Sequence, residues 1–127
     1  CQPADNSALL AKLRAATEGF EGTVSLYARN LDTGATVGIL EDQPVRTAST
    51  IKLPIMVAAF RAVNERKARW TDKVAITPAS KVSGSGVIRE FADGTRLTLR
   101  DLVHVMIVVS DNTATNLVLD RLSADYV

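Results

Sequence analysis

Two short runs of polar residues stand at the ends of apolar stretches and carry the groups that could do chemistry. In the first, Ser49-Thr-Ile-Lys52, a serine precedes a lysine by three positions. Residues three apart share one face of a helix, so the lysine amine can reach the serine hydroxyl and, when neutral, take its proton. A helix N-terminus adds free N–H groups that favour developing negative charge. The spacing therefore predicts a nucleophile, Ser49, with Lys52 as its base.

The alternative interpretation of this run is a capping serine followed by a lysine whose amine extends into solvent. A chain of this composition yields about 0.3 such pairs by chance, so the spacing alone is weak evidence. Its surroundings are stronger evidence. Lys52 is the only charged residue between Arg46 and Arg61, in a stretch otherwise suited to a core. A charged residue buried there needs a polar partner.

The second run is Ser110-Asp111-Asn112, which follows another apolar stretch. The alternative interpretation is a turn with a helix cap, because these residue types bond to their own backbone. Chance supplies only about 0.02 such triplets in this chain. The two runs together, each at the end of an apolar helix, are much stronger evidence for a site than either one alone.

Hydrophobic periodicity predicts the elements that must position these runs. Helices are expected over residues 7–20, 49–66, 102–109 and 113–123, hairpin strands over 23–30 and 36–40, an extended piece over 73–77 and a loop over 81–94. Residues 98–101 form a capping box in the sequence pattern. The helix at 49–66 is apolar nearly all round, so we expect it to be buried on nearly all sides. A lone hairpin is marginal, so something should complete its sheet.

Composition limits the class of protein. Apolar residues make up 46% of the 127 residues, charged residues 23%, and the net charge is +1. These are ordinary values for one globular domain and exclude a disordered tail. The low net charge argues against a nucleic-acid partner, and the apolar runs are too short to cross a membrane. One histidine and one cysteine cannot build a metal site, so we expect no metal and no cofactor.

The single cysteine and the single histidine each have a simple interpretation. Residues 1–6 are expected to be a polar linker. Cys1 is either an accident of the numbering or the acylated end of a bacterial lipoprotein, which would give a lipid anchor. His104 lies in an apolar helix, where a buried, satisfied histidine is expected rather than a base, since nothing supplies the third member of a triad.

At this point the chain resembles a family, the serine-reactive β-lactamase and penicillin-binding-protein superfamily, and most of all its class A β-lactamases. The matching stretches are residues 49–52, 93–102 and 110–117. The resemblance implies an α+β fold of the α/β sandwich type. Residues 7–127 would be the N-terminal half of one such domain, a helical lobe plus the first two strands of an antiparallel sheet.

The resemblance also implies catalytic roles for three residues of the two runs. Ser49 would open a β-lactam or peptide carbonyl to form an acyl-enzyme, with its own backbone N–H as half of the oxyanion hole. Lys52 would act as a base, and Ser110 would relay a proton toward the leaving nitrogen.

The resemblance implies a role for three further residues, two of them in binding. Asn112 would hold the amide of the substrate side chain, and Asp111 would be structural. Ser85, in the loop over residues 82–87, would border the site. The family usually carries an aromatic residue near this rim, where this chain has serine and glycine.

Two parts of the family's machinery are missing after Asn112, namely a later glutamate that activates water and a Lys-Thr-Gly strand. The complementary half is expected as a second chain, through a swapped dimer, or in a longer protein of which this is a piece. We therefore expect a β-lactamase-type serine hydrolase that is inactive as the isolated chain and acts outside the cytoplasm on β-lactams or cell-wall peptides. The alternatives are a penicillin-binding or D-Ala-D-Ala peptidase-like protein, or an inactive truncated protein that traps ligand.

Overall fold

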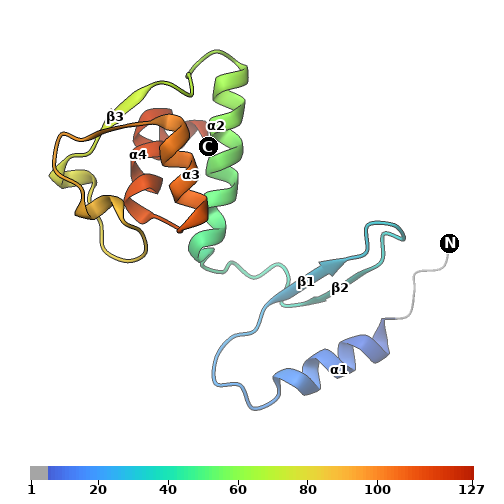
Figure 1. Ribbon diagram of the computed structural model, residues 1–127. Coiled ribbons are helices and arrows are strands. Elements are labelled where there is room, and N and C mark those ends of the chain that lie inside the picture. The colour runs from blue at the N-terminus through green and yellow to red at the C-terminus, as the bar shows by residue number, and fades with distance from the viewer. Residues whose placement is uncertain (1–5) are drawn as a thin grey trace. The chain divides into compact units, whose positions relative to one another are not determined.

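The structure, a computed structural model, describes residues 6–127. The chain divides into two compact units, Cys1–Arg46 and Thr47–Val127, whose elements are drawn in Figure 1. Cys1 and all but the last residue of the expected linker lie outside the described residues. Four α-helices and two small antiparallel sheets make up the described part, so the predicted α+β class is confirmed.

The first unit holds a helix and a hairpin. Its elements are α1 (Ser7–Thr17), β1 (Leu26–Arg29) and β2 (Thr36–Ile39), each shorter than predicted. The strands pair antiparallel with Leu26 opposite Ile39. Within the described residues each of these two strands pairs only with the other, so the outer edges of both are open.

The hairpin closes because of the residues at its tip. The side-chain oxygen of Asn30 accepts hydrogen bonds from the backbone N–H groups of Asp32 and Thr33, at 2.9 and 3.0 Å. Gly34 follows with φ +74°, a left-handed conformation that glycine adopts without steric cost. An asparagine that imitates a backbone turn, followed by a glycine, is enough to reverse the chain here.

The second unit is mainly helical. Its elements are α2 (Lys52–Asn64), β3 (Lys73–Ala75), β4 (Arg96–Thr98), α3 (Leu99–Val108) and α4 (Asn112–Leu122), with short 3₁₀ turns at Ala48–Ile51, Pro78–Ser80, Ile88–Glu90 and Ala124–Tyr126. Strands β3 and β4 pair antiparallel. The sequence did not predict β4, because three residues carry too little alternation to identify a strand without its partner.

Helix α3 is capped by the residues that form the predicted capping box. The N–H of Asp101 donates to the Thr98 hydroxyl at 3.1 Å, and the N–H of Thr98 donates to the Asp101 carboxylate at 3.3 Å. Both residues therefore satisfy N–H groups that a helix start leaves without partners. The predicted cap is confirmed, and the helix starts three residues earlier than expected.

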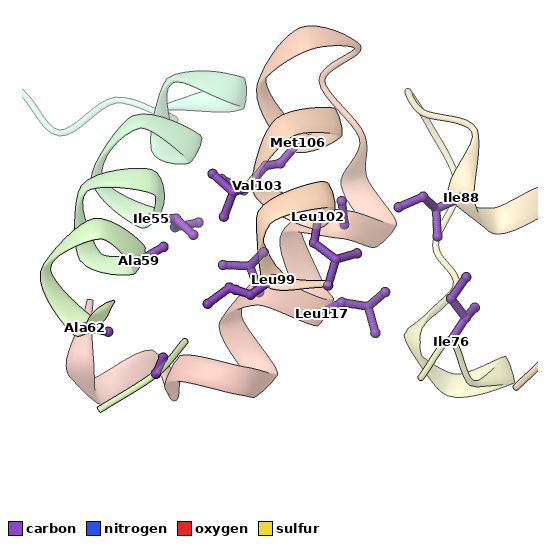
Figure 2. Packing of buried hydrophobic residues seen from close by; sticks show 13 residues of the cluster. Ile55, Ala59, Ala62, Ile76, Ile88, Leu99, Leu102, Val103, Met106 and Leu117 are labelled. Atoms are coloured by element: carbon purple, nitrogen blue, oxygen red, sulfur yellow. The ribbon is translucent and has the colours of Figure 1, made fainter. Parts of the chain in front are cut away.

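Three helices enclose the core of the second unit, as Figure 2 shows. Ile55 and Ala59 of α2 face Leu102 and Met106 of α3, and all four are at most 1% exposed. Side chains from α4 and from the loops complete the cluster, among them Leu117, Ile76 and Ile88. The core holds α2 and α4 against each other and so fixes the distance between the two polar runs.

One face of α2 contradicts the prediction that this helix is buried on nearly all sides. Leu53, Val57 and Phe60 are 53%, 61% and 57% exposed. Their spacing of four and three positions makes them one stripe on the helix. The buried apolar residues of α2 lie on the other side of the helix and are Ile55, Ala58, Ala59 and Ala62. We call Leu53, Val57 and Phe60 the apolar stripe of α2.

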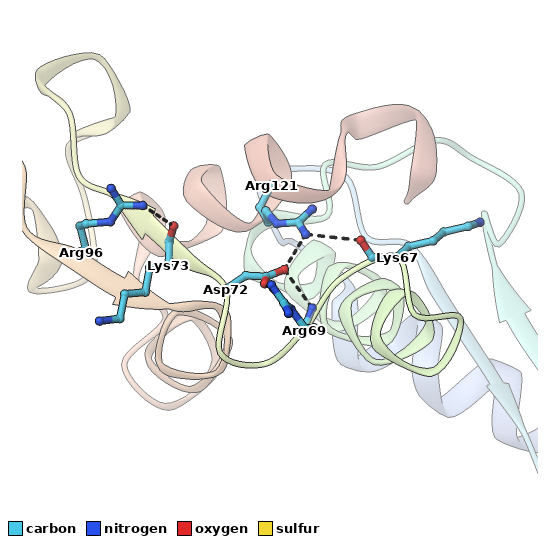
Figure 3. A network of polar contacts seen from close by, with 6 residues as sticks. All are labelled: Lys67, Arg69, Asp72, Lys73, Arg96 and Arg121. Carbon is cyan, nitrogen blue, oxygen red and sulfur yellow. Dashed lines mark hydrogen bonds and ion pairs between the residues drawn. The ribbon is translucent and has the colours of Figure 1, made fainter.

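A polar network ties α4 to the segment after α2 (Figure 3). Asp72 accepts a hydrogen bond from the backbone N–H of Arg69 at 2.9 Å and pairs with the Arg121 guanidinium at 2.5 Å. Arg121 also reaches the Lys67 carbonyl at 3.4 Å. The Arg69 N–H, followed by the Arg121 guanidinium, lowers the pKa of Asp72 to about 2, because both favour the carboxylate.

We predict that Asp72→Asn lowers the melting temperature at neutral pH. In the unfolded chain an aspartate titrates near ~3.9, above the folded pKa of about 2. The stabilisation by ionised Asp72 is therefore complete above about pH 4 and is lost as the pH falls toward 2. Melting curves of both proteins at pH 7, 5, 3 and 2 should differ at pH 7 and 5 and converge at pH 2. Asp120→Asn, an exposed carboxylate beside Arg121, is the control, and a pH-independent difference would contradict the prediction.

Candidate functional site

The first polar run lies in a 3₁₀ turn, Ala48–Ile51, that leads directly into α2. Ser49 belongs to the turn, and Lys52 is the first residue of the α-helix. Ala48 has φ +44°, a left-handed conformation that is strained for a residue with a side chain. The turn presents an exposed Ser49 while the Lys52 side chain enters the protein, 4% exposed.

The second run meets the first through its serine. The Ser110 hydroxyl is 2.9 Å from the Ser49 hydroxyl and 2.9 Å from the Lys52 amine. The Lys52 amine is also 3.4 Å from the Ser49 hydroxyl. One amine and two hydroxyls thus form a triangle in which a proton can pass along any side. Helices α2 and α4, packed through the core, bring these groups together across more than fifty residues of sequence.

The amine of Lys52 is held by two groups that can only accept hydrogen bonds. Its Nζ lies 2.6 Å from the Ser110 carbonyl and 2.8 Å from Asn112 Oδ1. Two of its N–H bonds must point at these oxygens in either protonation state. The remaining position, an N–H in the ammonium or a lone pair in the neutral amine, faces the hydroxyls of Ser49 and Ser110. Lys52 can therefore exchange a proton with a hydroxyl without breaking its two fixed bonds.

The polar partners predicted for Lys52 are neutral hydroxyl, carbonyl and amide oxygens. Within residues 6–127 no carboxylate forms an ion pair with this amine. Each polar atom that surrounds it is an oxygen of Ser49, Ser110 or Asn112. The hydrogen-bonding capacity of the amine can therefore be satisfied in its charged form and in its neutral form.

Asp111 organises the second run without touching the triangle. Its carboxylate is 1% exposed and accepts from the backbone N–H groups of Val87 at 2.6 Å, Ile88 at 2.9 Å and Ala114 at 2.8 Å. The bond from Ala114 caps α4, since Asp111 is its N-cap residue. The other two bonds fasten the preceding loop to the helix. One buried side chain thus fixes the turn that holds Ser110 and Asn112.

The loop over residues 82–87 is joined to the second run by two more hydrogen bonds and to the residue after that run by a third. Asn112 donates from its side chain to the Ser83 carbonyl at 3.2 Å and from its backbone to the Ser85 carbonyl at 3.0 Å. The N–H of Val82 donates to the Thr113 hydroxyl at 3.2 Å. The loop therefore lies alongside the start of α4 and forms a wall beside Lys52.

A cleft of about 450 Å³ opens at this wall. The residues that line it are Ala48, Ser49, Ile51, Lys52, Val82, Ser83, Asn112, Thr115 and Asn116. Ser85, expected to border the site, is not among them; its carbonyl bonds to Asn112, and Ser83 lines the cleft instead. Sequence reasoning also missed Asn116, although it stands four positions after Asn112 and so on the same helix face.

A larger hollow of about 750 Å³ lies between α2 and α3. Met56, Phe60 and Trp70 line it together with His104, and none of the residues of the triangle does. His104 is exposed, so the expectation of a buried core histidine is wrong. The helix that carries it buries a different face, through Leu102 and Met106.

Two absences can be stated for residues 6–127. They contain no group of three or more metal-ligating side chains close enough to hold an ion. None of their helices has the length and apolar character needed to cross a membrane.

Comparison with known proteins identifies a matching family. The model of the "Beta-lactamase enzyme family" matches residues 8–127. The "Beta-lactamase regulatory protein BlaB" of Streptomyces cacaoi is 28% identical over 113 residues, which cover 88% of this chain and 36% of that protein.

Solved structures agree as well. The structure of PBP-A is 32% identical with a TM-score of 0.87, over 96% of this chain and 46% of that one. A β-lactamase structure from Sphaerobacter thermophilus is 41% identical with a TM-score of 0.82 and the same coverage of both chains. The chain thus spans less than half the length of these relatives.

We predict that Asp111→Asn destabilises the protein by about 2–3 kcal/mol, because hydrogen bonds to a buried charged group are worth that much. An amide has one accepting oxygen, so its NH₂ must face either Ala114 N–H or the pair from Val87 and Ile88. Urea denaturation measures the loss. The isosteric change Asp120→Asn at an exposed position is the control, and equal midpoints for Asp111→Asn and the parent would contradict the prediction.

Proposed function

The chain belongs to the beta-lactamase enzyme family, and from this premise we propose that Ser49 is the nucleophile of an acyl transfer that opens a β-lactam amide. The observation that carries the proposal is the triangle of Ser49, Ser110 and Lys52, with sides of 2.9, 2.9 and 3.4 Å. A serine hydroxyl needs a base within hydrogen-bond reach to become a nucleophile, and the amine of Lys52 is that base.

In the proposed step, the proton that leaves Ser49 is matched by the proton that the ring nitrogen gains. Ser49 Oγ attacks the carbonyl carbon of the lactam and gives up its proton to neutral Lys52, directly or through Ser110. Negative charge gathers on the carbonyl oxygen, where the N–H of Ser49, in the first turn of a helix, can stabilise it. The C–N bond then breaks and the ring nitrogen takes the proton of the Ser110 hydroxyl, which Lys52 replaces. The product is an ester on Ser49 with Lys52 neutral again.

In this proposal the substrate binds in the cleft, beside the side chain of Asn112. The side-chain amide of Asn112 lines the cleft beside Ser49. It offers the kind of hydrogen bond that an amide on the substrate side chain requires. Ser83, rather than Ser85, is the residue of the 82–87 loop that we propose to contact substrate.

A trapping protein is the second candidate function. A solved structure of a PBP-A mutant, matched at 32% identity, is described as an acyl-enzyme complex with penicillin G, and BlaB is described as a regulatory protein. A protein that forms the ester but hydrolyses it slowly would bind β-lactam or cell-wall peptide without turnover. Acylation of Ser49 is common to both functions, and the rate of ester hydrolysis separates them.

Turnover, in this proposal, needs the complementary half, as a second chain, in a longer protein or through a swapped dimer. The apolar stripe of α2 supports this, since three large apolar side chains on one helix face favour a covering partner. We further propose an extracytoplasmic location, where β-lactams and cell-wall peptides are met. A lipid anchor at Cys1 is part of this proposal.

We predict that a fluorescent penicillin labels Ser49 when the complementary half is present. Ser49→Ala should abolish the label, and Lys52→Met, which keeps the stem and removes the amine, should slow it about 10²–10⁴-fold. Gel fluorescence and intact mass give the readout, with Ser25→Ala as the matched control. A label that survives in Ser49→Ala, or its absence from the complemented parent, would sink the proposal.

We predict that the purified 127-residue chain hydrolyses no chromogenic cephalosporin. Addition of a polypeptide with the later half of the family fold, including Lys-Thr-Gly, should start turnover or, for a trapping protein, a single burst. Val57→Lys, in the apolar stripe, should prevent the gain while leaving the melting temperature of the chain unchanged, because Val57 is 61% exposed. Steady hydrolysis by the verified chain alone would refute the requirement for a second half.

A further inference from the structure

We propose that Gly84 is a positioning residue, which fixes the orientation of the Asn112 side chain and, through it, the hydrogen bonds of Lys52. The consequence for acylation rests on the function proposed above, whereas the positioning itself can be tested on the chain as it stands. The proposal concerns a residue whose own atoms need not touch substrate, since it acts through Asn112.

Both the oxygen and the nitrogen of the Asn112 side-chain amide form hydrogen bonds within the protein. Its oxygen accepts from Lys52 Nζ at 2.8 Å, and its nitrogen donates to the Ser83 carbonyl at 3.2 Å. If the amide turned over, its NH₂ would face an N–H of Lys52 and its oxygen would face the Ser83 carbonyl, and both contacts would be repulsive. The loop carbonyl therefore determines that an oxygen faces the amine.

This arrangement leaves room for only a hydrogen at position 84. A Cβ added to Gly84 would lie 2.5 Å from the Asn112 side-chain nitrogen and 3.7 Å from its Cγ. The nitrogen could retreat only by rotation of the side chain, which breaks its bond to Ser83 and moves the oxygen away from Lys52. Gly84 also has φ +102°, which disfavours a side chain at this position for a separate reason.

Two other glycines separate these effects. Gly94 has φ +83°, and an added Cβ would meet nothing within 4 Å, so its substitution measures backbone strain alone. At Gly86 an added Cβ would overlap the Asp111 carboxyl group and lie 2.6 Å from the Asp111 backbone Cα, which cannot move aside. Only at Gly84 is the obstacle a functional side chain that can be pushed out of place while the fold remains.

The displacement would change what Lys52 can do. A neutral amine has two N–H bonds, which the Ser110 carbonyl and Asn112 Oδ1 occupy in the structure. Without the Asn112 oxygen, one of these N–H bonds turns to a hydroxyl, and the lone pair no longer faces Ser49. A misplacement of this size in a catalytic group is worth about 10²-fold in rate.

The first test is spectroscopic and needs neither substrate nor a second half. In the 127-residue chain labelled with ¹⁵N, the Asn112 side-chain NH₂ should give a distinct pair of resonances, because one proton is bonded to Ser83. Gly84→Ala should shift this pair and speed its exchange with water, and Gly94→Ala should leave both unchanged. Unchanged Asn112 resonances in folded Gly84→Ala would overturn the proposal.

A second test covers the case in which Gly84→Ala weakens the fold. Asn112→Ala removes the nitrogen that an added Cβ would strike. The loss of melting temperature from Gly84→Ala should therefore be smaller in the Asn112→Ala background than in the parent. The loss from Gly94→Ala should be the same in both. An equal loss from Gly84→Ala in the two backgrounds would show that residue 84 acts independently of Asn112 and would also overturn the proposal.

The third test joins the proposal to function. With the complementary half present, Gly84→Ala should slow penicillin labelling of Ser49 about 10²-fold, and Gly94→Ala should leave the rate as in the parent. A parent that is never labelled contradicts the function proposed for Ser49 and leaves the spectroscopic test to decide on Gly84. A labelled parent with an equally fast Gly84→Ala variant contradicts the positioning role.

Discussion

The buried carboxylate of Asp111 is the interaction on which the site depends. A carboxylate removed from water is tolerated only when its oxygens are filled with hydrogen bonds, and three backbone N–H groups fill them here. Two of those N–H groups belong to the loop after Ser85 and one belongs to the first turn of α4. The same side chain therefore starts a helix and fastens the end of the loop whose earlier residues, Val82 and Ser83, line the cleft. Ser110, held at φ +54° just before it, is left with its hydroxyl and carbonyl directed at Lys52.

Lys52 supplies the second constraint on the site, because its amine is buried. A lysine in the first turn of a helix that builds the core cannot reach water easily, so the protein must solvate its amine. It does so with a carbonyl, an amide oxygen and two hydroxyls instead of a carboxylate. A carboxylate partner would hold the amine in its charged form. Neutral oxygens can satisfy the amine with or without its third proton.

The sequence could predict features that depend on a few neighbouring residues, and it could not predict features that depend on contacts between distant ones. The isolation of Lys52 in an apolar stretch predicted a polar partner, and residues 98–101 predicted a helix cap, because both signals are visible within a few residues. The strand β4 depends on its pairing with β3, and the role of Ser83 in lining the cleft depends on which loop residue faces α4. His104 was misjudged for a related reason, since apolar neighbours along a helix do not reveal which side of it faces the core. The close approach of Gly84 to Asn112 joins residues 28 positions apart, and no local pattern encodes it.

The apolar stripe of α2 links the residue pattern of one helix to the packing of the whole domain. Ile55 and Ala59 bury one side of the helix against α3 and α4, while Leu53, Val57 and Phe60 remain exposed on another. A helix in an ordinary monomer carries polar residues on its solvent face. The sequence of α2 instead continues the core pattern around the helix, as if both sides were meant to be covered. The site groups lie at the N-terminal end of this same helix, so whatever covers the stripe also approaches Ser49. A partner that covered the stripe would therefore complete the burial of α2 on the side that the core of this unit leaves exposed.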